Sequence, residues 1–173
     1  QGLTERIGRI TGELRDFARK SDGPPVPVQL AQAISGTRLL IGSRTRSSAP
    51  AMAIDSSGVP ETLAVLTDRT RVEQVLVNLL QNALEAGAAR VLITAAPEGD
   101  GRSVAIRVQD DGPGILPAIA AALFTPFQTS KPTGLGLGLV IARDICRAMG
   151  GDLVLEAADI GSRFRITLPA VPA

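Results

Sequence analysis

The sequence predicts an α+β fold in which a mixed, mostly antiparallel sheet forms one layer and about three helices form the other. First, stretches with helical spacing of apolar residues alternate with short runs in which apolar and polar residues alternate. Second, turn-forming residues over Pro97–Gly101 join two such runs, and so short a connection requires antiparallel strands. Third, 173 residues, 45% of them hydrophobic, suffice for one packed domain with a short appendage. We therefore expect a two-layer α/β sandwich preceded by a helical stump.

The first residues have the pattern of a helix that packs on other helices. Its apolar side chains follow spacings of four, three, four and three, at Leu3, Ile7, Ile10, Leu14 and Phe17. The turn-forming run Ser21–Pro25 ends this helix. We expect residues 1–22 to be the end of a longer helix with its linker, and residues 23–173 to be the domain. Gln1 in place of an initiating Met also indicates a piece of a longer protein.

The next part of the chain is expected to contain one helix and three short strands. Val28–Leu30 indicates a strand, and residues 31–44 indicate a helix. The inward side chains of this helix are expected to be Ile34, Leu40 and Ile41. Met52–Ile54 and Leu63–Leu66 indicate two more strands, and the turn residues Ser56–Gly58 between them predict a hairpin.

A long amphipathic helix follows, with Asp68 as its cap and its end near Gly87. Its apolar positions are Val72, Val75, Leu76, Leu79, Leu80 and Ala83. Alternating residues predict a hairpin of strands at Val91–Ala95 and Val104–Val108. A last helix is expected over Leu137–Met149, closed by two glycines. The final strands are expected at Leu153–Leu155 and Phe164–Leu168.

Composition excludes some classes of function. The net charge is 18 − 17 = +1, which creates no general field for nucleic acid, and aromatic residues are only 2%. We therefore expect no nucleic-acid partner. The single cysteine, Cys146, cannot form an internal disulfide and is expected to be a buried thiol. No run of about 20 apolar residues is present, and histidine is absent from the chain.

Three segments carry residues suited to binding a ligand. On the long helix, Asn78, Asn82 and Glu85 lie along one stripe beside the apolar face. The run Asp110–Ile115 places a carboxylate at the end of a strand, where it can accept a hydrogen bond from an exocyclic amine, and its glycines let a flat ring approach the backbone. Each pattern also occurs without a ligand, as a solvated helix flank or an ordinary turn.

The third segment, Thr129–Leu139, is rich in glycine and runs into the last helix. Glycines before a helix expose N–H groups and the positive end of the helix dipole, which suits phosphate oxygens. Lys131 can add a charge-assisted contact. The spacing matches neither a dinucleotide-binding fingerprint nor a P-loop. A loop without a ligand is the alternative.

In their order and spacing these segments resemble the N, G1, F and G2 boxes of the histidine-kinase ATP-binding domain. The matching stretches are Asn78 with Asn82, the D-D-G-P-G-I run at 110–115, the L-F-T-P-F run at 123–127 and the G-L-G-L-G-L run at 134–139. This Bergerat-type superfamily includes gyrase, the heat-shock chaperone of ninety kilodaltons and MutL. The likeness spans about Val28 to Pro169 and is greatest to C4-dicarboxylate transport sensors, with nitrogen-regulation and oxygen-sensing kinases also similar.

The resemblance implies ATP and Mg²⁺ as ligands, with Asn82 helping to hold the metal and Asn78 nearby. It implies that Asp110 binds the adenine amino group, that Gly112 and Gly114 border the base, and that residues 124–133 form a mobile lid. The remaining residues expected at the nucleotide are Glu85, Ile115, Phe127, Thr129, Ser130, Lys131, Gly134, Leu135, Gly136, Leu137 and Gly138. Leu135 departs from the family, where Thr is frequent, and we expect a small effect because that loop contributes mainly backbone groups.

The resemblance also implies a protein histidine kinase whose acceptor histidine lies upstream of Gln1, on the first helix of a dimerisation and phosphotransfer hairpin. The residues R-I-G-R-I-T-G-E-L-R-D-F-A-R-K near the amino end resemble the end of that hairpin's second helix. The expected partners are this hairpin and a cognate response regulator. The expected location is the cytoplasmic side of an inner-membrane sensor. The short seam predicts a monomer or a weak dimer for this chain.

Three alternatives remain. A gyrase-like or MutL-like ATPase carries a Glu at the position of Asn78 to activate water, and an amide cannot act as that base. A serine kinase of the anti-sigma type shares the fold and the boxes but lacks the hairpin. A non-catalytic relay module binds nucleotide without transferring phosphate.

Overall fold

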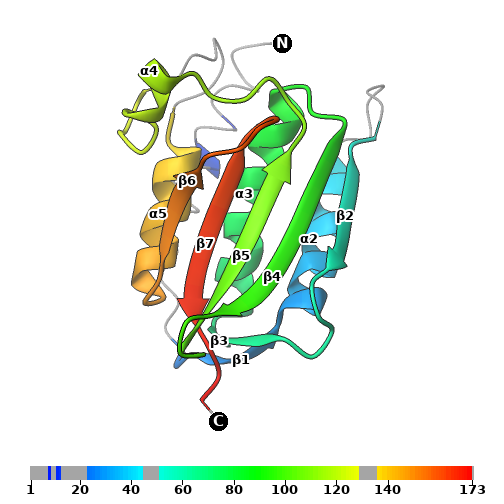
Figure 1. The fold of residues 1–173 in the computed structure, drawn as a ribbon, viewed down its shortest axis with the longest axis vertical. Helices are drawn as coiled ribbons and strands as arrows, with labels where there is room; N and C mark the ends of the chain where they lie inside the picture. The colour runs from blue at the N-terminus through cyan, green and yellow to red at the C-terminus, as the bar shows by residue number, and fades with distance from the viewer. Residues whose placement is uncertain (1–7, 9–10, 13–22, 45–50, 129–135, 173) are drawn as a thin grey trace.

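Five strands form the main sheet of the computed structural model, and helices cover one of its faces (Figure 1). The structure describes residues 8, 11–12, 23–44, 51–128 and 136–172. The predicted α+β architecture with two layers is confirmed. The helices are α2 (Leu30–Arg44), α3 (Arg69–Glu85), α4 (Pro117–Ala120) and α5 (Gly138–Ala148). The strands of the main sheet are β2 (Ala53–Gly58), β4 (Arg90–Glu98), β5 (Ser103–Asp110), β6 (Asp152–Glu156) and β7 (Arg163–Pro169).

The main sheet is mixed and mostly antiparallel, as expected. Its order is β2-β4-β5-β7-β6, and the last four strands pair antiparallel with one another. β2 alone runs parallel to its neighbour, with Ala53 opposite Arg90 on β4. Two further strands, β1 (Val26–Gln29) and β3 (Ala64–Thr67), form a small antiparallel sheet of their own.

The predicted hairpin around Ser56–Gly58 is wrong. These residues belong to β2, and the chain turns after them, where the Val59 and Leu63 amides donate to the carbonyls of Ser56 and Pro60. One ion pair and one hydrogen bond hold β2 beside β4 and α2 instead. Arg90 of β4 pairs with Asp55 at 2.7 Å, and Arg38 of α2 donates to the Ile54 carbonyl at 2.8 Å. The tertiary neighbours of β2 therefore override the local turn signal.

The inward face of α2 also differs from the prediction at one position. Ile34 and Ile41 are buried as expected, but Leu40 is 45% exposed. Thr37 takes the buried place on this face, with no exposed surface. Its hydroxyl donates to the Ala33 carbonyl at 2.9 Å, so the helix itself satisfies the polar group.

Helix α3 lies at the centre of the helical layer, between α2 and α5. Asp68 caps it by accepting a hydrogen bond from the Arg71 amide at 3.3 Å, as predicted. Seven of its aliphatic residues are buried, and complete burial of a Val or Leu side chain stabilises by about 1.5–3 kcal/mol. They are Val72, Val75, Leu76, Val77, Leu79, Leu80 and Ala83. The core thus holds the polar flank of α3 at a fixed angle.

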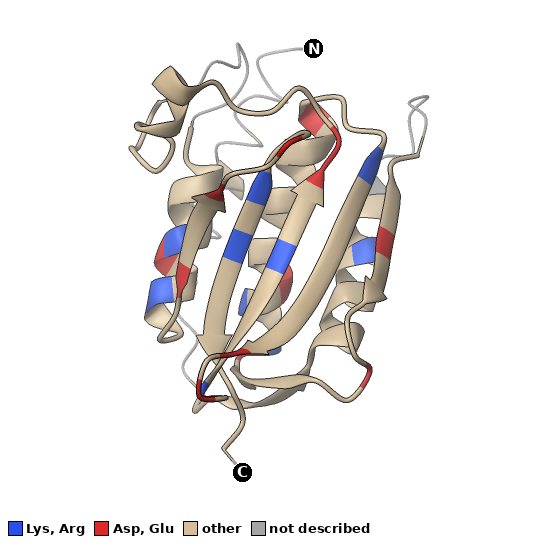
Figure 2. Cartoon of the chain, in the orientation of Figure 1, with Lys and Arg blue, Asp and Glu red and all other residues tan. Residues whose placement is uncertain are grey.

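Charged residues lie along the strands of the main sheet (Figure 2), and on β5 and β7 they alternate with buried residues. Glu156 of β6 accepts hydrogen bonds from Arg107 of β5 at 3.0 Å and lies 3.3 Å from Arg165 of β7. Arg165 also pairs with Glu98 of β4 at 2.9 Å. One network of alternating charge therefore crosses four adjacent strands.

The predicted amino-terminal helix lies largely outside the described residues, of which Gly8, Thr11 and Gly12 are helical. Cys146 is fully buried, and burial raises the pKa of its thiol to about 12. None of the helices in the described ranges has the length and hydrophobicity needed to cross a bilayer.

Candidate functional site

Asp110 ends strand β5 and lies at the corner where β5 meets β7. The residue is 8% exposed, and its backbone amide donates to the Ser162 carbonyl at 3.0 Å. Its Oδ1 accepts from the amides of Gly112 at 2.8 Å and Ser162 at 3.3 Å, and its Oδ2 accepts from the Ser162 hydroxyl. An ionised carboxylate has about four lone-pair sites, so a fixed acceptor with spare capacity remains for a ligand.

The chain around this carboxylate leaves no room for side chains. Gly161 has φ +67°, and a methyl group on it would lie 1.8 Å from the Asp110 carbonyl oxygen. Gly114 has φ +79°, and a methyl group there would lie 2.9 Å from the Gly161 carbonyl oxygen. Only glycine satisfies both demands. Two loops therefore close tightly over the end of β5, and Ile115 continues from them against the core.

The asparagine stripe on α3 runs from this corner toward α5. Asn78 is half-buried, and its side-chain amide donates to the Gly138 carbonyl at 3.1 Å. Asn82 follows one turn later and is also half-buried. Glu85 ends the helix, is exposed and accepts from Gln81 at 3.1 Å.

The C-terminal end of the stripe meets the Asp110 corner. A methyl group on Gly112 would lie 3.7 Å from the Ala86 side chain, just beyond the last residue of α3. From Asn78 to Ala86 the helix rises about 12 Å, at 1.5 Å per residue. The structure thus brings the stripe, the Asp110 run and the start of α5 together at one end of the sheet, which is the upper end in Figure 1.

Helix α5 begins at Gly138 next to the stripe. Leu137 precedes it and supplies no side-chain cap. First-turn N–H groups of such a helix are satisfied by water or by a ligand, and they suit anions.

The loop before this helix is described only at its two ends. Gly136 has φ +68° and lies against the Gln128 backbone. Phe127 is 71% exposed and has φ 63°. The other predicted residues of this loop, Thr129, Ser130, Lys131, Gly134 and Leu135, lie outside the described residues.

The donor set fits a cation that is held mainly by its substrate. In the described ranges no three His, Cys, Asp or Glu residues gather into a metal cluster. The amide oxygens of Asn78 and Asn82 are hard ligands, and Mg²⁺ accepts one or two protein ligands while phosphates and water supply the rest.

Sequence reasoning missed Ser162 and Gly161. Both lie in the turn before β7, where a Gly-Ser pair by itself indicates only a turn. Their contact with Asp110 depends on the register of β5 and β7, in which Gln109 lies opposite Arg163. Only the pairing of β5 with β7 could have pointed to these two residues, and local sequence does not encode that pairing.

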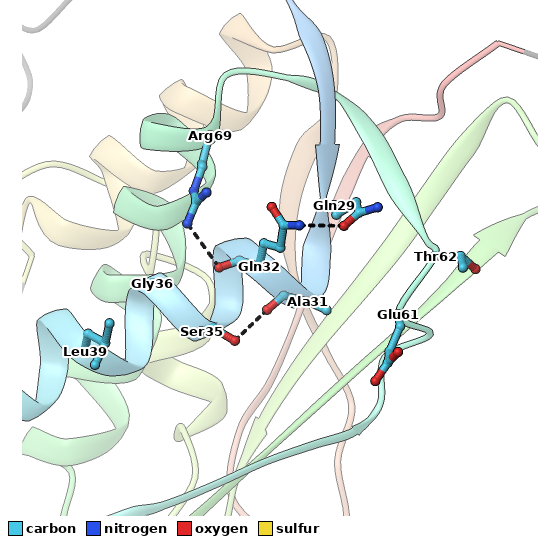
Figure 3. Close-up of a pocket in the computed structure, with 9 residues that line it drawn as sticks. All are labelled: Gln29, Ala31, Gln32, Ser35, Gly36, Leu39, Glu61, Thr62 and Arg69. Atoms are coloured by element: carbon cyan, nitrogen blue, oxygen red, sulfur yellow. Dashed lines mark hydrogen bonds between the residues drawn. The ribbon is translucent and has the colours of Figure 1, made fainter.

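An open surface depression of about 660 Å³ lies elsewhere, along α2 and the segment between β2 and β3 (Figure 3). Its polar groups already bond one another: Gln32 donates to Gln29 at 2.7 Å, and Ser35 donates to the Ala31 carbonyl at 2.9 Å. Arg69, at its edge, pairs with Glu73 at 2.8 Å. The depression contains none of the predicted site residues and presents no converging groups of its own.

Comparison with known proteins gives consistent matches. The family model described as histidine kinase-, DNA gyrase B-, and HSP90-like ATPase matches residues 67–172. The C4-dicarboxylate transport sensor protein DctB of Rhizobium meliloti is 42% identical over 172 residues, covering 96% of this chain and 27% of that protein. The sensor protein FixL of Bradyrhizobium diazoefficiens is 37% identical, covering 95% of this chain and 33% of that protein. The chain thus spans a third or less of the length of these relatives.

Solved structures agree. The nucleotide-free catalytic domain of histidine kinase ThkA aligns with a TM-score of 0.71 at 31% identity, over 86% of this chain and 97% of that domain. Full-length ShkA in complex with AMPPNP gives a TM-score of 0.74 at 27% identity, over 95% of this chain and 36% of ShkA. ThkA in complex with the response regulator protein TrrA gives a TM-score of 0.70 at 26% identity, over 98% of this chain and 49% of that one.

The family model covers more than half of the chain. The chain belongs to the histidine kinase-, DNA gyrase B- and HSP90-like ATPase family.

Proposed function

We propose that this chain is the ATP-binding part of a two-component sensor histidine kinase. It binds ATP with Mg²⁺ and transfers the γ-phosphate to a histidine that lies upstream of Gln1. The observation that carries the proposal is the arrangement along α3, where a fixed, buried carboxylate stands at one end and the Asn78–Gly138 contact at the other. Such an arrangement matches a ligand with an amine-bearing ring at one end and phosphates at the other.

At the base end, Asp110 accepts a hydrogen bond from the adenine amino group. Ser162 and Gly112 hold the carboxylate in place through their own hydrogen bonds, so it needs no reorganisation when the base binds. The tight glycine turns at Gly114 and Gly161 hold the two loops beside this carboxylate in place.

At the phosphate end, the N–H groups at the start of α5 bind phosphate oxygens. Asn82 helps to hold the magnesium ion, which neutralises phosphate charge when bound. Asn78 offers an amide rather than a carboxylate, and an amide cannot abstract a proton from water. We therefore infer slow ATP hydrolysis and retention of the γ-phosphate for a protein acceptor, a reaction that depends mainly on positioning and charge neutralisation.

We assign residues 1–22 to the end of a phosphotransfer hairpin and residues 23–173 to the ATP-binding domain. The acceptor histidine belongs to the same hairpin, and the phosphoryl group passes from it to a response regulator. This part of the protein lies on the cytoplasmic side of a membrane sensor. The sensor names of DctB and FixL, and the ThkA complex with TrrA, support these assignments by similarity.

Calorimetric titration with AMPPNP and Mg²⁺ tests the binding step. Asp110→Asn is expected to weaken binding by about tenfold or more, because an amide donor would face donors and the adenine amine. Asn82→Ala is expected to weaken binding only when Mg²⁺ is present.

Asp111→Asn is the matched control. Asp111 also accepts two backbone hydrogen bonds, from Ala89 at 2.8 Å and Arg90 at 2.9 Å, but it is exposed and its bonds go to the start of β4, not to Gly112 and Ser162. The Asp111→Asn variant should bind AMPPNP with an affinity within about twofold of the wild type. Equal affinity for wild type and Asp110→Asn would refute the assigned adenine site.

A second experiment identifies the acceptor. The chain is joined to its upstream hairpin and incubated with labelled ATP, and acid-labile phosphohistidine is the expected product. Acid-stable phosphoserine on a partner would instead support the anti-sigma type of kinase. Rapid phosphate release without a phosphoprotein would support the gyrase-like ATPase.

A further inference from the structure

Arg143 connects three segments that are separate in the sequence. It lies on α5, and its guanidinium carbon is 4.6 Å from the centre of the Phe124 ring. The same guanidinium pairs with Asp152 at the start of β6, with Nε–Oδ1 at 2.9 Å and Nη2–Oδ2 at 3.4 Å. Its side chain is 25% exposed. Helix α5, strand β6 and the segment around Phe124 therefore meet at one side chain.

The carboxylate partner is itself held in place. Asp152 Oδ1 accepts from its neighbour's amide, Leu153 N, at 2.9 Å and from Arg147 Nε at 3.2 Å. Arg147 shares Asp152 with Arg143, whereas the ring contact recorded for Phe124 is with Arg143. The two arginines thus separate two effects, ion pairing with Asp152 and contact with Phe124.

Phe124 begins the stretch that leads back to α5. The ring packs against the hydrophobic core, and the chain continues to Gln128, whose backbone lies against Gly136 two residues before the helix. Residues 124–128 therefore touch α5 or its approach at two places. One is the Arg143 guanidinium, and the other is Gly136.

We propose that Arg143 is a positioning residue that holds residues 124–128 against α5 and so fixes the approach to the α5 N-terminus. This inference rests on the proposed function, in which that N-terminus binds phosphates. Arg143 touches neither Asn78 nor Asp110 in the contacts described, and it acts through Phe124. The expected defect is therefore in nucleotide affinity at the phosphate end, with the base end unchanged.

An arginine suits this place for two reasons. Its planar group stacks on an aromatic ring and pairs two nitrogens with a carboxylate at the same time. Lysine retains a positive charge that can lie over the ring and pair once with Asp152, so it is the conservative replacement. Glutamine retains polarity but loses the charge.

The test compares AMPPNP affinity, in the presence of Mg²⁺, across four variants of the chain. Arg143→Gln and Phe124→Leu are each expected to weaken binding about fivefold, the size of a partly shielded cation–π contact. Arg143→Lys should restore most of the affinity. The double variant Arg143→Gln with Phe124→Leu should be no weaker than the weaker single variant, because both remove one contact. Adenosine affinity should not change in any of them.

Arg147→Gln is the matched control, since it removes the neighbouring ion pair with Asp152. It should leave AMPPNP affinity within about twofold of the wild type, as expected for an exposed pair. An Arg147→Gln defect as large as that of Arg143→Gln would overturn the proposal, because the effect would then come through Asp152. Fully additive losses in the double variant would overturn it as well.

Amide hydrogen exchange without nucleotide keeps the test independent of the proposed function. Residues 121–128 should exchange faster in Arg143→Gln and Phe124→Leu than in the wild type or Arg147→Gln. Unchanged exchange would overturn the positioning role. If the wild type fails to bind AMPPNP but exchange changes as expected, the proposed function is refuted and the positioning role of Arg143 still holds.

Discussion

At the scale of single residues, the candidate site contains a contact between Asp110 and Ser162, which are 52 positions apart in the chain. Both are buried, at 8% and 9% exposure, and the serine gives the carboxylate two hydrogen bonds. Buried polar groups of this kind specify one orientation when all their bonds are made. The carboxylate is therefore oriented before any ligand arrives.

Ser162→Ala is expected to lower the free energy of unfolding by about 1–2 kcal/mol, because it removes one donor from a buried acceptor. AMPPNP affinity should fall with it, and Ser162→Thr should retain most of both properties. Urea unfolding measures the first effect and calorimetry the second. Ser35→Ala, which removes a hydroxyl bonded to its own exposed helix, serves as the control. Wild-type stability in Ser162→Ala would contradict the orienting role.

Sequence alone singled out Asp110 and Asn78 as candidate site residues because each stands in a local pattern: a strand end followed by glycines, and a helix stripe. It did not single out Ser162, since no pattern within residues 157–162 indicates a contact with residue 110. That proximity arises when β7 pairs with β5. A residue that stands in a pattern of its own segment can thus be proposed from the sequence, whereas a residue whose contact depends on a neighbouring strand cannot.

At the scale of elements, α5 is anchored to β6 through Asp152. The hydrogen bond from Arg143 is the main cause that lowers the pKa of Asp152 from 3.8 to about 2. The charged carboxylate is therefore favoured in the folded state. Its contribution to stability is present above about pH 4 and is lost as the pH falls toward 2.

Asp152→Asn should lower the free energy of unfolding at pH 7 by about 1 kcal/mol, a value discounted for solvent screening because the side chain is 40% exposed. The difference from wild type should narrow as the pH falls below 4. Urea unfolding between pH 7 and pH 3 measures it. Asp159→Asn, at an exposed position in the β6–β7 turn, should show no comparable loss at pH 7. A difference that stays constant to pH 3 would argue against the ionic origin.

Elements were predicted with uneven success, and the reason is visible in two of them. Helix α3 has a complete apolar face and a capping Asp68, so its period alone defined it. Helix α2 buries Thr37 in place of Leu40, which a hydrophobic pattern cannot anticipate because the threonine hydroxyl is satisfied by Ala33. The prediction that β2 pairs with the next strand was wrong for a similar reason. Contacts with Arg90 and Arg38, which are distant in the sequence, hold β2 beside β4.

At the scale of the whole molecule, the helices cover one face of the main sheet, so the domain has two layers (Figure 1). The alternation of helical and strand periods was enough to predict this arrangement. Strand order was not predictable, because β5 and β7 are neighbours although β6 and two helices lie between them in the chain. Periodicity reports which face of an element is buried, and it carries no information about which element covers it.

The parallel position of β2 bears on the order in which the sheet folds. Ala53 meets Arg90 across 37 positions (90 − 53), whereas β4 and β5 are joined by only the four residues between Glu98 and Ser103. Local pairings form before long loops close. Ile93→Val, in β4, should therefore slow refolding, whereas Ile54→Ala, in β2, should mainly speed unfolding in stopped-flow measurements. The reverse result would contradict this order. Along the chain, β2 is the first strand of the main sheet, and it is thus expected to be the last to join that sheet.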